Sequence, residues 1–115
     1  MTQQPRSAQP GADLHRVTTS TVVTRALVNY AQAQECFWLL HLYASHLFTI
    51  DGDKEWFTCL TITVRDDAAN ITIEDGNGNT LARQHVEYTD FALQEAKLFG
   101  VWQAPYWVIM LPSDY

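Results

Sequence analysis

Three oxygen-bearing side chains, Asp75, Asn77 and Asn79, recur at alternate positions in the segment EDGNGNTL, residues 74–81. This spacing resembles the start of a calcium-binding EF-hand loop, in which carboxylate and amide oxygens bind the ion. That loop also requires glycine at its sixth position and glutamate at its twelfth, where the sequence has Thr80 and Val86. Asp-Gly and Asn-Gly pairs are typical of two-residue turns between antiparallel strands. We therefore predict a hairpin turn here and no metal site.

Histidine and cysteine, the other common metal ligands and nucleophiles, do not form a recognisable motif. No two histidines are four residues apart, as a helical zinc site requires. Both cysteines lie in apolar segments, where a free thiol packs like a small hydrophobic group, and this favours a reducing cytosol. Nucleophile-elbow and phosphate-loop sequences are absent. We predict no catalytic residue and no cofactor. The residues considered are His15, His41, His46, His85, Cys36 and Cys59.

Negative charge is concentrated in the second half of the chain. Residues 1–50 carry three basic and two acidic side chains, whereas residues 51–115 carry four basic and eleven acidic ones. A field of this sign repels nucleic-acid phosphates and favours a basic protein surface, although ordinary solubility would also explain it. We expect no direct nucleic-acid binding. The acidic residues predicted to contact a protein partner lie in turns at strand ends: Asp51, Asp53, Glu55, Asp66, Asp67, Glu74 and Asp75.

Aromatic side chains are dense in the C-terminal segment FGVWQAPYWVIMLPSDY. Most of them are expected in the core. Because successive residues of a strand point to opposite faces, Tyr106 and Trp107 cannot both point inward. Exposed tryptophan and tyrosine often anchor protein interfaces. We therefore predict that Trp102 and Tyr106 contact the partner.

The pattern of apolar residues predicts one α+β domain over residues 14–115, preceded by a flexible arm over residues 1–13 that is rich in Gln, Pro and Ser. The β-branched segment 17–24 is predicted to be a short edge strand. Helical spacing begins at Thr24, a plausible N-cap, and a second helix is expected over residues 35–48. From Glu55 onward the apolar residues recur at every second position, which predicts β-strands. The economical packing is a single antiparallel sheet of four to five strands against two adjacent helices.

The chain is expected to be cytoplasmic. Its first twenty residues lack the apolar segment of a secretory signal. The longest apolar stretch, CFWLLHLYASHLF, is too short and too polar to span a bilayer.

Four motifs in a fixed order carry a resemblance to a known family. They are FWLL with the following AS in residues 37–45, EDGNGN at 74–79, YTDF at 88–91 and LPSDY at 111–115. The sequence resembles an uncharacterised domain-of-unknown-function family of small bacterial proteins, often carried on plasmids and other mobile elements, with a pattern like YWLLD..IAS, EDGNG, YTDFPL and LLPSEY. It departs from that pattern at His41, at Ala92 and over residues 23–25. The resemblance implies a mobile-element setting and no particular activity.

These observations favour a non-enzymatic protein that uses its acidic second half and an aromatic anchor to occupy a basic surface. In a mobile-element setting, the specific hypothesis is an inhibitor of host defence, such as an anti-CRISPR protein that covers the nucleic-acid-binding surface of a nuclease or CRISPR effector complex. One alternative is a structural or regulatory homo-oligomer, in which segment 17–24 or the last aromatic strand pairs with a second copy. Another is a small metal-dependent enzyme.

Overall fold

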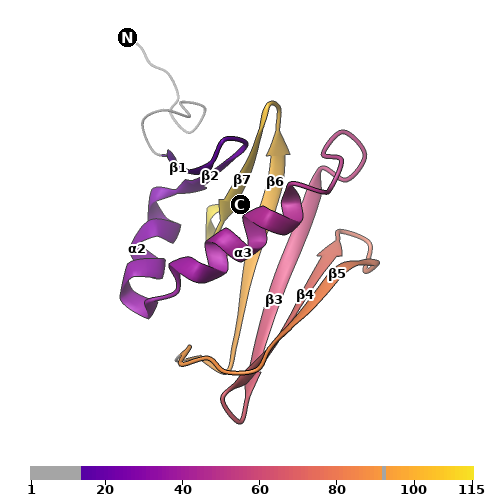
Figure 1. Ribbon diagram of the computed structural model, residues 1–115. Coiled ribbons are helices and arrows are strands. Elements are labelled where there is room, and N and C mark those ends of the chain that lie inside the picture. The colour runs from indigo at the N-terminus through magenta and orange to yellow at the C-terminus, as the bar shows by residue number, and fades with distance from the viewer. Residues whose placement is uncertain (1–13, 92) are drawn as a thin grey trace.

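The structure, a computed structural model, describes residues 14–91 and 93–115, so the predicted arm over residues 1–13 lies outside the described residues. Two helices pack on one face of a mixed β-sheet, which confirms the α+β class (Figure 1). The elements are β1 (Leu14–Thr18), β2 (Thr21–Thr24), α2 (Arg25–Gln34), α3 (Phe37–Leu47), β3 (Phe57–Arg65), β4 (Ala68–Asp75), β5 (Thr80–Val86), β6 (Glu95–Gln103), β7 (Tyr106–Met110) and the short 3₁₀ helix η2 (Pro112–Asp114).

The sheet is larger than predicted. It has seven strands in the order β1-β2-β7-β6-β3-β4-β5, so the prediction of four to five strands was wrong. The prediction that the sheet is antiparallel was wrong for one pair, because β2 runs parallel to β7. The segment predicted as one edge strand turns between Thr18 and Thr21 and forms the antiparallel pair β1 and β2. The pairing of Thr21 with Trp107 then joins distant parts of the sequence, which no local pattern indicates.

The two helices follow one another with only a short break. Thr24 caps α2 as predicted, because its side-chain Oγ1 accepts a hydrogen bond from the Leu27 N–H at 3.3 Å. Glu35 ends α2 in the left-handed conformation, at φ 53°, so the second helix begins at Phe37, two residues later than predicted. No helix in the described ranges is long and apolar enough to cross a membrane.

Replacement of Thr24 by alanine is expected to lower the free energy of unfolding by about 1 kcal/mol. The Thr24 hydroxyl accepts from Leu27 and also donates to Asp114 Oδ2 at 2.8 Å, so it connects the start of α2 to the C-terminal segment. Chemical denaturation would measure the loss. Thr24→Ser keeps the hydroxyl and should stay close to the wild type; equal losses in both variants would contradict the capping argument.

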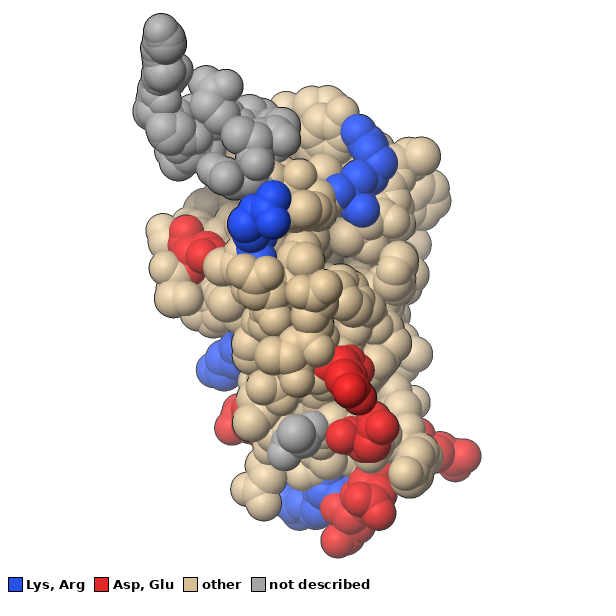
Figure 2. Space-filling view, turned by 90° about the vertical axis from the view of Figure 1, so that its left-hand side faces the viewer, with Lys and Arg blue, Asp and Glu red and all other residues tan. Residues whose placement is uncertain are grey.

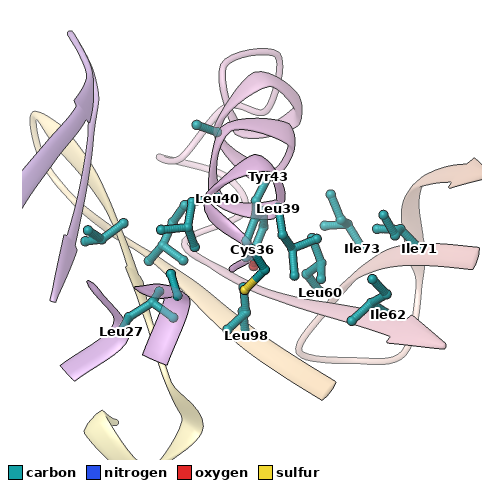
Figure 3. Close-up of a cluster of buried hydrophobic side chains, with 14 of the residues drawn as sticks. Leu27, Cys36, Leu39, Leu40, Tyr43, Leu60, Ile62, Ile71, Ile73 and Leu98 are labelled. Carbon is teal, nitrogen blue, oxygen red and sulfur yellow. The ribbon is translucent and has the colours of Figure 1, made fainter. Parts of the chain in front are cut away.

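The main core lies between the helices and the sheet (Figure 3). In β3, Thr58, Leu60 and Ile62 are fully buried on the helix side, while Cys59 and Thr61 are only half-buried, which confirms the predicted alternation. Cys36 is also buried, and burial raises the pKa of its thiol to about 11. Both cysteines are free, as predicted. The other large buried side chains are Leu27, Leu39, Leu40, Tyr43, Leu47, Ile71, Ile73, Leu98 and Ile109.

A buried polar contact crosses the centre of this core. The Tyr43 hydroxyl lies 2.7 Å from Thr58 Oγ1, and Thr58 Oγ1 donates to the Gly100 carbonyl at 3.0 Å. The Thr58 proton is thereby used, so the Tyr43 hydroxyl donates to Thr58. Burial raises the pKa of Tyr43, and the hydroxyl stays protonated. This chain of hydrogen bonds fixes α3 against β3 and β6.

The opposite face of the sheet carries a smaller apolar cluster around Val22, Val101, Val108 and Met110. Phe57 and Phe99 pack beside it, and the ring of Tyr115 lies on both, at 5.3 and 5.6 Å between centroids. The C-terminal segment therefore folds back over the end of β6 and β3, where the candidate site is found.

Candidate functional site

The structure places the seven predicted acidic residues at opposite ends of β3. This strand has nine residues and spans about 26 Å at 3.3 Å per residue. Five of the seven lie at its Phe57 end, because the loop before β3 and the end of β4 meet there: Asp75 pairs with Thr58 and Glu74 with Cys59. We call this group the first acidic end; it comprises Asp51, Asp53, Glu55, Glu74 and Asp75.

Asp66 and Asp67 lie at the other end of β3, in the turn to β4. Sequence reasoning grouped them with the five residues of the first acidic end, but the structure separates them from that end and brings three more carboxylates to this one. The Thr89 N–H donates to the Asp67 carbonyl at 2.7 Å, and Glu95 pairs with Thr63. Figure 2 shows acidic side chains gathered toward this lower end of the molecule. We call this group the second acidic end; it comprises Asp66, Asp67, Glu87, Asp90 and Glu95.

The Asp66-Asp67 pair forms the two-residue turn that was expected at residues 74–81. Both residues have positive φ, 54° and 65°, a conformation that hairpins usually supply with Asn-Gly. The turn at Asp75–Asn79 is longer. The Gly78 N–H donates to the Asp75 carbonyl, the Asp75 N–H donates to the Asn79 carbonyl, and Gly78 has φ 88°. The predicted hairpin is confirmed, but its two-residue geometry was wrong.

Asp75 organises this turn through its side chain. Its Oδ1 accepts from the N–H groups of Asn77 and Asn79 at 2.8 and 2.9 Å, and its Oδ2 accepts from Asn79 Nδ2 at 2.9 Å. These hydrogen bonds, first of all those from Asn79, lower the pKa of Asp75. The oxygen-rich spacing therefore serves the turn itself.

The lowered pKa of Asp75 predicts a pH dependence of stability. Because the folded-state pKa lies below the unfolded value of about 3.8, the stabilisation is present above about pH 4 and is lost as the pH falls through the folded-state pKa. Thermal melting from pH 6 to about pH 2.5 should show this loss. Asp75→Asn should have a flatter profile in that range, because asparagine does not ionise. Asp66→Asn is the matched control, and a flattening of equal size there would contradict the assignment.

The loop before β3 is held by its own backbone and by Trp102. Asp51 accepts the Asp53 N–H at Oδ1, 3.0 Å, and the Lys54 and Glu55 N–H groups at its carbonyl, 3.1 and 2.9 Å. The Trp102 indole N–H donates to Asp53 Oδ1 at 3.2 Å. The carboxylates of this loop therefore project from a fixed turn.

A hollow of about 630 Å³ opens at the first acidic end. Trp56 and Tyr115 line it with 55% and 64% of their surfaces exposed, and exposed aromatic side chains of this size are common at interfaces. Carboxylates and aromatic rings thus share one concave surface. Its lining residues are Lys54, Glu55, Trp56, Phe57, Asp75, Gly76, Asn77, Asn79 and Tyr115.

The two predicted aromatic anchors are placed differently. Tyr106 and Trp107 point to opposite faces, as predicted, with Trp107 buried and Tyr106 half-buried under the Arg16 guanidinium at 5.4 Å. Trp102 is half-buried and packs on Trp107. Neither predicted anchor lines the large hollow, and sequence reasoning missed Trp56. Its position directly after the polar segment IDGDKE was the available signal.

Smaller hollows lie elsewhere on the molecule. One of about 230 Å³ at the second acidic end is lined by Trp38, Val86, Tyr88, Thr89 and Asp90. Another of about 170 Å³ contains His15 and His41 among apolar side chains. Within residues 14–91 and 93–115, no three His, Cys, Asp or Glu side chains are grouped so that they could hold a metal ion.

Comparison with known proteins gives one match. The sequence model of DUF6876, described as a family of unknown function, matches residues 8–115. No curated protein and no solved structure matches the chain.

Proposed function

The chain belongs to DUF6876, a family of unknown function, and from this premise we propose that it is a non-enzymatic binding module whose first acidic end occupies a basic surface on another protein. The predicted resemblance to an uncharacterised family is confirmed, whereas the mobile-element setting stays a prediction.

One observation carries the proposal: carboxylates from two separate segments meet beside an aromatic-lined hollow. The loop 51–55 supplies three carboxylates and the end of β4 supplies two. Trp56 and Tyr115 are exposed beside them. Hot spots of protein interfaces are enriched in tryptophan, tyrosine and arginine. A surface of this kind fits a partner that presents lysine or arginine, and it repels nucleic-acid phosphates.

A more specific version follows from the same charge distribution. Carboxylates gather beyond both ends of β3, a strand about 26 Å long, so a basic nucleic-acid-binding groove of that length could be covered. In this version the protein inhibits a host-defence nuclease or CRISPR effector complex by presenting carboxylates in place of phosphates. The test is competition: the protein should displace DNA from such an effector, and variants neutralised at both acidic ends should not.

The general proposal is tested by binding to a defined basic protein probe, a histone-tail peptide mixture, at low and high salt. Binding should weaken as salt is raised from about 50 to 500 mM, because exposed charge pairs are screened over about a Debye length. The double variant Glu55→Gln/Glu74→Gln should bind more weakly than Asp66→Asn/Glu87→Gln, which removes the same number of charges at the second acidic end. Binding that does not respond to salt, or no binding, would contradict the proposal.

A homo-oligomer is the second candidate, favoured by the position of β5. The strands at the edges of the sheet are β1 and β5, so the version in which the last aromatic strand pairs with a second copy is wrong, because β7 lies between β2 and β6. An edge strand leaves backbone groups free for a neighbouring chain. Light scattering over a range of concentrations would separate a dimer through β1 or β5 from a monomer.

A further inference from the structure

We propose that the hollow at the first acidic end binds an arginine side chain of the partner, with the guanidinium stacked on Trp56 and paired with Glu55. This inference rests on the proposed function and specifies the group that is recognised. The hollow of about 230 Å³ near Trp38 and Tyr88 serves as the internal comparison below.

The hollow has the size of a small ligand site. Its volume of about 630 Å³ falls within the range of about 300 to 1,000 Å³ found for such sites, larger than one guanidinium group needs. The remaining space would hold the arginine stem and a neighbouring residue of an extended segment. The volume is therefore sufficient for a side chain inserted from a polypeptide.

The aromatic walls hold one another in place. The Phe57 ring packs edge-to-face against Trp56, Phe99 and Tyr115, with centroid distances of 5.8, 5.0 and 5.3 Å. The Trp56 carbonyl also accepts a hydrogen bond from the backbone N–H of Trp102 at 2.8 Å, which connects the backbone of Trp56 to β6. Trp56 therefore offers a positioned indole, and tryptophan is the strongest aromatic partner for a cation.

The carboxylates have different capacities. Asp75 lines the hollow, but its oxygens already accept three hydrogen bonds within the turn. It is held as an anion by those bonds and contributes charge, with little capacity for a new bidentate pair. Glu55 is half-buried, lines the hollow and is the carboxylate left to pair with a guanidinium.

Arginine fits this site better than lysine. Its guanidinium is planar, stacks on an aromatic face and offers two parallel donors to a carboxylate, whereas the lysine ammonium is a compact and strongly hydrated charge. A purely electrostatic surface would bind peptides of either residue equally. A preference for arginine over lysine therefore distinguishes binding in the hollow from non-specific electrostatic attraction to the negative surface.

The test compares nona-arginine and nona-lysine peptides by isothermal titration calorimetry on the full chain. The wild type should bind nona-arginine about fivefold more tightly than nona-lysine. Trp56→Ala should remove this preference, and Trp56→Tyr, which keeps an aromatic face, should restore most of it. Tyr88→Ala removes an aromatic ring at the second acidic end that is 73% exposed, against 55% for Trp56, and should leave the preference unchanged. Glu55→Gln should weaken nona-arginine binding more than nona-lysine binding.

The outcomes distinguish the inference from the function on which it rests. If both peptides bind equally, or if Tyr88→Ala and not Trp56→Ala removes the preference, the proposal of an arginine site is wrong. The proposal of an acidic binding module is then retained. If neither peptide binds, both are overturned. Thermal melting of each variant confirms that it is folded.

Discussion

Replacement of Gly100 by alanine is expected to lower the free energy of unfolding by about 2 to 4 kcal/mol. A Cβ atom at this position would lie 2.7 Å from Thr58 Oγ1 and 2.8 Å from the Tyr43 hydroxyl oxygen. Both atoms are buried and hydrogen-bonded to one another, so neither can move without losing a partner. The variant therefore combines overpacking with the loss of a buried hydrogen bond.

Chemical denaturation followed by circular dichroism would measure this loss. Gly76→Ala is the matched control, because its Cβ would meet only the Phe57 ring, at an ordinary 3.4 Å, and the expected change is within about 0.5 kcal/mol. Tyr43→Phe removes one of the two clashing atoms, so the double variant Tyr43→Phe/Gly100→Ala should be less destabilised than the sum of the single variants. Additive losses would contradict the steric explanation.

The features that the sequence predicted correctly depend on neighbouring residues. The alternation in β3 follows from the period of Leu60 and Ile62, and the cap at Thr24 from one hydroxyl before a helical pattern. The hairpin at Asp75–Asn79 follows from its Asp-Gly and Asn-Gly pairs. The number of residues in this turn could not be predicted. A glycine in the left-handed conformation at the third loop position is compatible with a longer turn as well as with a two-residue turn.

The features that were missed depend on distant residues. The parallel pairing of β2 with β7 places Thr21 beside Trp107. The periodicity of apolar residues within either segment does not indicate this pairing. The division of the acidic residues was within reach of the sequence, since Glu55 and Asp66 flank the same nine-residue strand and must lie at its opposite ends. The packing of Trp102 over Gly52 could not be predicted, because the two residues are far apart in the sequence.

Replacement of Trp102 by alanine should have the second large effect, a loss of about 3 kcal/mol in the free energy of unfolding. The indole packs on Trp107 at 5.4 Å between centroids, and it covers Gly52, where an added Cβ would overlap the ring. Its N–H also holds Asp53. The loop that carries three carboxylates of the first acidic end therefore loses both its packing and its hydrogen bond.

Two milder variants separate the roles of Trp102. Trp102→Phe keeps a ring over Gly52 but has no N–H donor, so it should cost about 1 kcal/mol and speed amide hydrogen exchange at Asp53, Lys54 and Glu55. Asp53→Asn keeps the acceptor oxygen and should leave that exchange close to the wild type while it weakens binding of basic peptides. If Trp102 instead contacts the partner directly, as the sequence suggested, Trp102→Phe would weaken binding with no change in loop exchange. Faster exchange would show that the residue acts by positioning the acidic loop, with the contact left to Trp56.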